Sequence, residues 1–144
     1  MARIKVDLPD KYIFTTDIPV RVTDLNYGGH VGNDKMLSIV QEARVQLLRK
    51  IGYKNETMIE DLGIIMVDTA VVYKAELFYG NKVKVEIGVK DFSEHGFDFV
   101  YRLIDAHVDI EYARVKTGIV FFNYTNRKIA KIPGQFLVKL NILQ

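Results

Sequence analysis

The residues of this chain best suited to chemistry lie together in residues 21–44, RVTDLNYGGHVGNDKMLSIVQEAR. A carboxylate, an amide and an imidazole occur there at Asp24, Asn26 and His30. Asp and His can act as general bases and Asp also as a nucleophile, whereas an Asn amide can only orient water or donate a hydrogen bond. On an extended backbone, Asp24 and Asn26 point to the same face. The residue types predict acid–base chemistry at this corner; the alternative is a structural role for each residue in a turn or cap.

Three glycines, Gly28, Gly29 and Gly32, lead from this group into an amphipathic helix. The first amides of a helix have no partner within the helix and carry partial positive charge. A glycine-rich entry lets a carbonyl oxygen approach such amides closely, as in an oxyanion hole. We therefore predict that a substrate carbonyl binds at this corner. The alternative is a glycine-rich turn that simply enters a capped helix.

The helix that follows is the clearest element in the sequence. Apolar residues recur at steps of three and four, at Met36, Val40, Ala43, Leu47 and Ile51. Asn33 or Asp34 can cap its start, and Gly52 supplies the left-handed stop. Glu42 flanks the apolar stripe, where its carboxylate can serve a site; the alternative is a solvated or ion-paired glutamate.

Most of the remaining chain has the period-two pattern of strands. It predicts strands over residues 12–24, 64–73, 82–91, 97–106 and 111–124, and a short helix over 56–62. Pro19 places its strand at an edge or bulge, and the apolar run of 64–73 predicts burial on both faces. Short connections favour antiparallel pairing. The pattern predicts one α+β domain over 1–144, with the sheet curled around one long helix and its exposed edges continued in a homodimer.

The composition excludes several classes of function. The chain has no cysteine, which rules out disulfides and thiolate metal sites and is compatible with the cytoplasm. Its net charge of +2 is small and its basic residues are dispersed, so we expect no nucleic-acid partner. No apolar run approaches the roughly 20 residues that span a bilayer, so we expect no membrane association. His95 and His107 have no metal-ligand company, and we expect no metal site.

Residues 24–33, DLNYGGHVGN, followed on the helix by QEAR, resemble the hotdog-fold acyl-CoA thioesterases. The similarity is to the 4-hydroxybenzoyl-CoA thioesterase family and its relatives among fatty acyl-ACP thioesterases, whose pattern is roughly D-x-D-x-x-G-H-V-N-N and then E-A-R. It covers nearly the whole chain. The resemblance implies the hotdog fold, an antiparallel sheet wrapped around one long central helix. It also implies an acyl-CoA or acyl-ACP substrate, a homodimer or homotetramer, and no cofactor beyond the CoA of the substrate.

Residue by residue, the resemblance implies a catalytic group of Asp24, Asn26, His30 and Glu42, and substrate contacts from Tyr27, Gly28, Gly29, Gly32 and Asn33. Two positions depart from the family pattern. Asn26 stands where the family has an Asp credited with catalysis, and Gly32 stands where it has Asn. Asn26 could orient water for another carboxylate, Asp24 or Glu42. The alternative function is a non-catalytic acyl-thioester-binding protein. A hotdog dehydratase is disfavoured because the helix lacks a paired Asp and His.

A basic cluster follows the last predicted strand. It consists of Arg127, Lys128 and Lys131. Because CoA carries phosphates, which bind lysine and arginine, we predict that this cluster contacts them. The alternative is a solvated end of the sheet.

Overall fold

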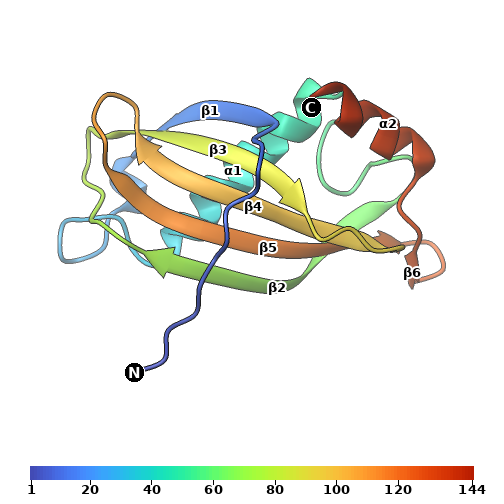
Figure 1. Cartoon of the computed structure of the whole chain (residues 1–144), viewed down its shortest axis with the longest axis horizontal. Helices are drawn as coiled ribbons and strands as arrows, with labels where there is room; N and C mark the ends of the chain where they lie inside the picture. The colour runs from blue at the N-terminus through green and yellow to red at the C-terminus, as the bar shows by residue number, and fades with distance from the viewer.

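A single antiparallel sheet forms the body of the molecule, with strand order β1-β3-β4-β5-β2 and β6 added beside β5 (Figure 1). The structure is a computed structural model that describes residues 1–144. Its strands are β1 (Phe14–Pro19), β2 (Gly63–Tyr73), β3 (Lys82–Lys90), β4 (Gly96–Asp105), β5 (Glu111–Asn123) and β6 (Lys128–Ala130). Its helices are a 3₁₀ turn (Val22–Asp24), α1 (Lys35–Lys50) and α2 (Gly134–Ile142). The order confirms the predicted α+β arrangement.

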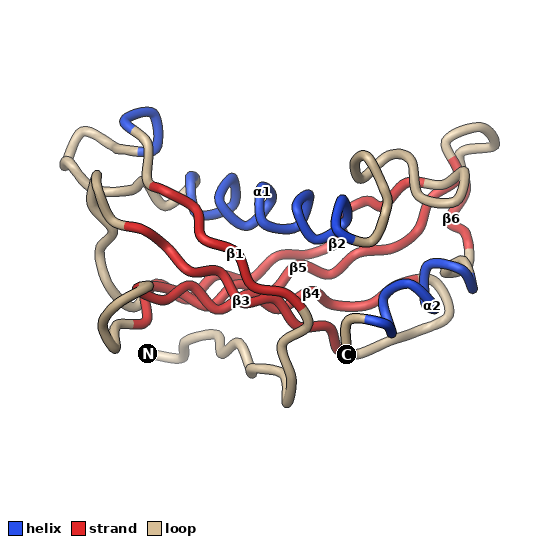
Figure 2. The backbone as a smooth tube through the Cα atoms, turned by 90° about the horizontal axis from the view of Figure 1, so that it is seen from above, coloured by secondary structure: helices blue, strands red, loops and turns tan.

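Helix α1 lies across one face of the sheet, and residues 1–11 cross the opposite face (Figure 2). The apolar stripe of α1 is the centre of the core, since Ala43, Leu47 and Leu48 are completely buried. A fully buried Leu contributes about 1.5–3 kcal/mol relative to an exposed one. The stripe packs on the inward-facing residues of β3, β4 and β5, among them Val85, Ile87, Phe99, Tyr101, Leu103 and Val115. This packing fixes where the start of α1 lies.

A buried polar network also holds α1 to the sheet. Arg44 Nη1 donates to the Tyr101 hydroxyl at 2.8 Å, which lies 2.9 Å from the Thr117 hydroxyl. Arg44 Nε donates to Glu56 Oε2 at 3.1 Å. Burial opposes the Arg44 charge, but Tyr101 and Glu56 outweigh it and raise the Arg44 pKa. Because every buried side-chain donor and acceptor finds a partner, the network adds to stability instead of subtracting from it.

On the outer face of the sheet, residues 1–11 form a strap. Within the strap Val6 is buried, and Arg114 Nη1 donates to the Val6 carbonyl at 3.5 Å. Pro9 packs directly on Gly88, where the ring leaves no room for a Cβ. A glycine in β3 is therefore what allows the strap to lie flat on the strands.

The sequence predicted most of these elements. Helix α1, its end at Gly52 (φ 101°), and strands β3, β4 and β5 are confirmed. The strand predicted over 12–24 stops at Pro19, because Pro cannot continue the ladder, and the chain turns into the 3₁₀ segment. Pro19 does end an edge strand, as predicted.

Two predictions were wrong, and one helix was missed. Residues 56–62 form a turn in which Glu60 and Asp61 have positive φ (50° and 66°), which a right-handed helix cannot contain. Strand β2 is an edge strand whose central residues 66–69 are exposed, so it is not buried on both faces. The C-terminal helix α2 was not predicted at all.

Candidate active site at the start of the central helix

The corner between β1 and α1 is a tight loop that pairs with itself. Leu25 and Val31 form an isolated antiparallel bridge. The Asn26 amide donates to the His30 carbonyl at 2.8 Å, and the Gly29 amide donates to the Asn26 carbonyl at 3.1 Å. Gly29 has φ 82°, a conformation that glycine adopts without strain. The loop therefore has a defined shape that presents its side chains in fixed directions.

Asn26 and His30 come together around Gly28. A Cβ placed on Gly28 would lie 3.2 Å from Asn26 Oδ1 and 3.4 Å from His30 Nε2. His30 Nδ1 lies 3.2 Å from the Val31 carbonyl, which can only accept, so Nδ1 carries the proton of the neutral ring. Nε2 is then left with its lone pair. The imidazole thus presents an acceptor on the side of Asn26.

The glycine amides are not open, contrary to the prediction for Gly28, Gly29 and Gly32. The Gly28 amide donates to Asn26 Oδ1 at 2.8 Å, and the Gly32 amide donates to the Asp24 carbonyl at 3.0 Å. The Gly29 amide is occupied as described above. The physical reason is that the backbone N–H groups of this short loop form hydrogen bonds with acceptors of the same loop, which leaves them unavailable to a ligand. These glycines shape the corner, and their amides are unavailable to a substrate.

The open amides lie one step further along, at Asn33 and Asp34. These are the central residues of a turn that the Lys35 amide closes on the Gly32 carbonyl at 3.0 Å. Neither amide donates to an acceptor within the protein. The Asp34 side chain, at the N-cap of α1, makes no capping hydrogen bond. Two unpaired amides at the positive end of a 16-residue helix can stabilise negative charge on an oxygen.

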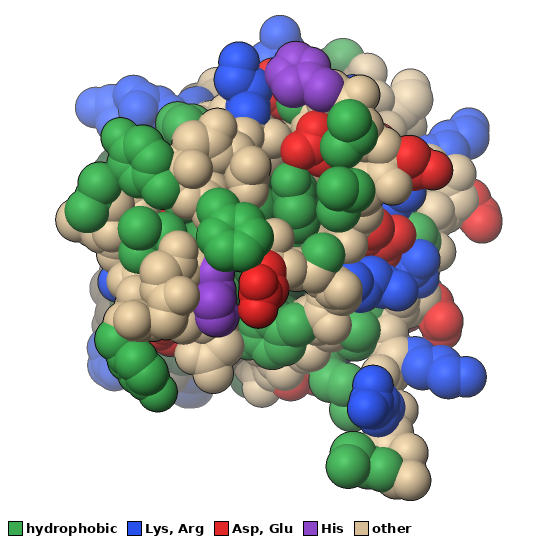
Figure 3. Space-filling view, turned by 90° about the vertical axis from the view of Figure 1, so that its left-hand side faces the viewer, with side chains coloured by type: hydrophobic (Ala, Val, Ile, Leu, Met, Phe, Trp, Pro, Cys, Tyr) green, Lys and Arg blue, Asp and Glu red, His purple; other side chains and the backbone are tan.

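A pocket of about 340 Å³ is lined by one of these two residues, Asn33. The polar groups of the pocket include His30, Asn33, Lys74 and Glu76. The residues that line it come from two segments of the chain: His30, Val31, Asn33 and Met36, and then Tyr73, Lys74, Ala75, Glu76 and Leu77. Figure 3 shows this end of the molecule, where hydrophobic, acidic and histidine side chains lie next to one another on the surface. Sequence reasoning missed Tyr73 and Glu76, because only the pairing of β2 with its neighbours brings that segment to α1.

Asp24 and Glu42 lie elsewhere, in a separate pocket of about 280 Å³ between β1 and α1. The Asp24 side chain is 3% exposed, and its Oδ2 accepts from the Arg21 amide at 2.8 Å. Its Oδ1 faces the Arg21 guanidinium at 3.4 Å. Glu42 accepts from Gln46 Nε2 at 3.0 Å. The structure brings these two carboxylates together, but it does not bring either into the pocket of His30.

The remaining predicted contacts divide between the two ends of the molecule. Tyr27 is fully exposed at the corner. The basic cluster lies at the opposite end, on the β5–β6 hairpin (Figure 1). There the Arg127 guanidinium lies 5.7 Å from the centre of the Phe122 ring, and Lys131 pairs with Glu94 at 3.0 Å. Within one chain the cluster therefore cannot reach a ligand at the start of α1.

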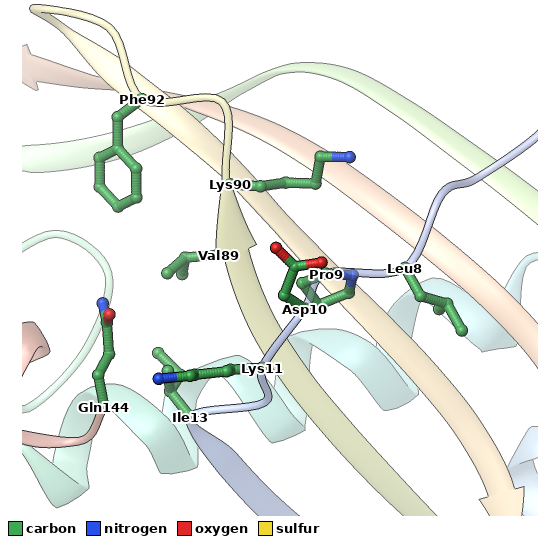
Figure 4. Close-up of a pocket in the computed structure, with 9 residues that line it drawn as sticks. All are labelled: Leu8, Pro9, Asp10, Lys11, Ile13, Val89, Lys90, Phe92 and Gln144. Carbon is green, nitrogen blue, oxygen red and sulfur yellow. The ribbon is translucent and has the colours of Figure 1, made fainter.

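A larger hollow, about 410 Å³, lies between the strap and the C-terminal end of β3 (Figure 4). It carries Asp10, Lys11 and Lys90 around apolar side chains and no histidine. No group of three or more His, Cys, Asp or Glu side chains is arranged to hold a metal ion. Neither α1 nor α2 is long and apolar enough to cross a membrane. The start of α1 remains the place where an open amide, that of Asn33, and the His30 imidazole share a pocket.

This chain is similar to several known proteins. A protein of Aquifex aeolicus (strain VF5), named only as a candidate esterase, is 27% identical over 111 residues, 76% of this chain and 83% of that protein. A 1,4-dihydroxy-2-naphthoyl-CoA thioesterase from Synechocystis has a TM-score of 0.79 at 21% identity, over 89% of this chain and 95% of that one. A 12:0-ACP thioesterase from Umbellularia californica has a TM-score of 0.77 at 17% identity, over 94% of this chain and 55% of that one.

The two structural likenesses confirm the hotdog fold. The family evidence comes from the sequence, in which residues 20–140 match the family model of the thioesterase-like superfamily. That match includes the whole corner from Asp24 to Asp34 and all of α1. The chain therefore belongs to the thioesterase-like superfamily.

Proposed function

We propose that the protein hydrolyses an acyl-CoA or acyl-ACP thioester to a free acid and a thiol. The observation that carries the proposal is the open amide of Asn33, which lines the His30 pocket, followed by the open amide of Asp34, in a chain of the thioesterase-like superfamily. Thioester hydrolysis needs a polarised carbonyl and a delivered water, and both needs match groups at this corner.

The thioester oxygen would lie against the Asn33 and Asp34 amides. Negative charge develops on that oxygen when water attacks, and the amides are held in place by the turn and by α1 before the substrate arrives. The acyl group would enter the pocket along Val31, Met36 and Leu77. Preformed donors of this kind stabilise the transition state more than the bound ester.

Asn26 and His30 would hold the water. Asn26 Oδ1 is occupied by the Gly28 amide, so the side-chain NH₂ group is what Asn26 offers to a ligand. His30 Nε2 offers an acceptor on the same side. A water between them is oriented by one donor and one acceptor. Asp24 would act through the loop, since its carbonyl accepts the Gly32 amide.

A second copy of the chain would complete the site. Edge strand β2 leaves Met66 and Val67 exposed, and its last residue, Tyr73, lines the pocket. Antiparallel pairing of β2 with β2 of a second copy brings the Gly63 end of one beside the Tyr73 end of the other. Phe122 of β5 pairs with Gly63. Arg127 and Lys128 of the second copy would thereby come to the substrate end, where CoA phosphates need cations.

The direct test is release of thiol from purified protein given short-chain, long-chain and aromatic acyl-CoAs and acyl-ACPs. We expect turnover of at least one class, with loss of activity in His30→Ala. Glu42→Ala tests whether the carboxylate of the separate pocket takes part. Absence of thiol release from every substrate, with the protein folded, would refute the proposal.

The alternative is an acyl-thioester-binding protein without hydrolysis, and the observation that favours it is the amide at Asn26. Binding of an acyl-CoA measured by calorimetry, without thiol release, would establish it. Asn26→Asp then separates the two functions. Activity that appears only in this variant favours the binding protein, whereas a modest change favours the enzyme.

A further inference from the structure

Two hollows meet where β3 ends and α2 crosses the molecule. The first, of about 410 Å³, lies between the strap and the end of β3 (Figure 4). The second, of about 420 Å³, lies along one face of α2. Phe92 and Gln144 line both, so the two hollows form one elongated depression, which we call the α2 groove. Its size is in the range of small-molecule sites, and it shares no residue with the pocket of His30.

Apolar side chains line the α2 groove along its length. Phe92 is 47% exposed, and on α2 Leu137 and Val138 are 39% and 56% exposed. Leu140 and Ile13 also line the groove and are buried. Exposed apolar residues that adjoin one another around a concave surface are typical of sites that bind an apolar group.

The walls of the groove are fixed before any ligand binds. The Ile13 amide donates to the Ile87 carbonyl at 2.8 Å, which ties the end of the strap to β3. The Phe92 ring stacks on Phe97 with 4.8 Å between the ring centres. Helix α2 is anchored in the core by Phe136, which is 1% exposed. A preformed groove binds a ligand without the cost of ordering its own walls.

A lysine is the charged group at the apolar space beside Phe92. Figure 4 shows Phe92, Val89, Lys11 and Gln144 around this space, with the Lys11 side chain extended toward Gln144. Lys11 is exposed and forms no ion pair within the protein. An ammonium group without a protein partner, next to an apolar surface, can bind an anion whose attached chain covers that surface.

The other charged side chains of the groove are Lys90 and Asp10. Lys90 extends away from Phe92 (Figure 4), and it also lines a small pocket that contains Asp98. The Asp10 carboxylate lies on the same side of Val89 as Lys90. Because these two charges are opposite, the net charge of the groove is that of Lys11. The groove therefore favours an anionic ligand over a cationic one.

We propose that the α2 groove binds a long-chain carboxylic acid, with its carboxylate at Lys11 and its chain along Phe92 and the exposed face of α2. A long apolar depression with a cation at one end matches the shape and charge of such an acid. The Gln144 side-chain amide can donate a hydrogen bond to the same carboxylate. The proposed hydrolysis releases an acid of this class. The further assignment of the groove as a second site for the product rests on that proposed function, whereas the binding itself does not.

Calorimetric titration with dodecanoate, below its micelle concentration, tests the charge preference. We expect saturable binding by the wild type and weaker binding of dodecyltrimethylammonium, which has the same chain and the opposite charge. Lys11→Glu should weaken dodecanoate binding by about 5–10-fold and reverse the preference between the two ligands. Lys54→Glu, at an exposed lysine after α1, is the matched control and should bind both ligands as the wild type does.

Val138→Asn tests where the chain lies. It replaces an apolar contact on α2 with a neutral polar one, and we expect dodecanoate to bind about 3–10-fold more weakly. Val108→Asn on the β4–β5 loop is the control, because both valines are 56% exposed. Melting temperatures close to that of the wild type would show that the variants fold. Equal effects of the two substitutions would overturn the placement of the chain on α2.

The outcomes distinguish the groove from the proposed function. His30→Ala should bind dodecanoate as the wild type does, whether or not the protein hydrolyses thioesters. If the wild type releases no thiol but shows this binding pattern, the site stands and only its assignment to the product falls. If thiol is released and dodecanoate does not bind, or its binding is lost in His30→Ala and kept in Lys11→Glu, the thioesterase stands and the groove is overturned. Sedimentation with vesicles that contain dodecanoate, without binding of the free acid, would also overturn it.

Discussion

The Tyr73 hydroxyl donates to the Asn33 carbonyl at 2.9 Å and so joins the last residue of edge strand β2 to the turn that carries the open amides. The two residues are far apart in the sequence and share the pocket of His30. The Asn33 amide and carbonyl flank one Cα within a tight turn, so a hydrogen bond that holds the carbonyl also restricts the direction of the amide. The hydrogen bond therefore helps to aim the turn, and it couples the site to whatever pairs with β2.

Tyr73→Phe tests this coupling. We expect kcat/KM to fall by about tenfold, while the free energy of unfolding changes by about 1 kcal/mol or less, the net value of one partly exposed hydrogen bond. Tyr79→Phe is the control, because Tyr79 is exposed and its hydroxyl bonds to nothing in the protein. Thiol-release kinetics and urea unfolding measure the two effects. A loss of stability equal to the loss of activity would contradict the aiming role.

Val67→Lys tests whether β2 is the interface between copies. Val67 is exposed on this edge strand, and a lysine there opposes strand addition. We expect the variant to shift toward monomer in light-scattering chromatography and to lose activity with it. Thr15→Lys introduces the same charge on β1, the opposite edge, and should leave the assembly unchanged. An active Val67→Lys monomer would rule out the shared site.

Arg127→Ala combined with Lys128→Ala tests the phosphate contacts. Exposed charge contacts contribute up to about 1 kcal/mol each, so we expect KM for acyl-CoA to rise about 3–10-fold with kcat nearly unchanged. Acyl-pantetheine has no nucleotide phosphates, and its KM should stay the same. Lys50→Ala at the end of α1 provides the control. Equal effects on both substrates would show that the cluster does not bind phosphate.

Tyr112 makes stability sensitive to alkaline pH. Burial, together with its hydrogen bond to Asp105 Oδ2 at 2.7 Å, raises the pKa of Tyr112 to about 12. An unfolded tyrosine titrates near pH 10. The contribution is therefore complete below about pH 10 and is lost as the pH rises toward 12. Unfolding measured at pH 8 and pH 11 should show a smaller decline in Tyr112→Phe than in the wild type; equal declines would contradict this.

The elements that the sequence predicted well have local causes. The apolar residues of α1 recur about every 3.6 residues and those of β3, β4 and β5 alternate with polar ones. Both patterns depend only on residues close together in the sequence, and the fold buries the faces that they predict. The apolar run of β2 was misread because its exposure depends on its position at the edge of the sheet, which no local pattern records. Helix α2 was missed although its buried residues, Phe136 and Leu140, have helical spacing.

The sequence predicted which segment holds the candidate site, but not how its side chains and amides are arranged. Asn26 and His30, which the sequence placed in one segment, do meet at Gly28. The occupied glycine amides could not be foreseen, because they depend on which carbonyls the loop folds against. Tyr73 and Glu76 enter the pocket through sheet pairing. Asn33 or Asp34 was predicted to cap α1; Asp34 does stand at the N-cap, but its side chain makes no capping hydrogen bond.

Because Pro9 packs directly on Gly88, the two faces of the sheet are covered by different segments of the chain. Helix α1 covers one face, and the strap of residues 1–11 crosses the other, where its residue Val6 is buried. A second sheet stacked on that side would meet the strap before it met a strand. We therefore expect a second copy to bind at an edge of the sheet instead of on this face. A larger residue at position 88 would displace the strap and expose the side chain of Val6.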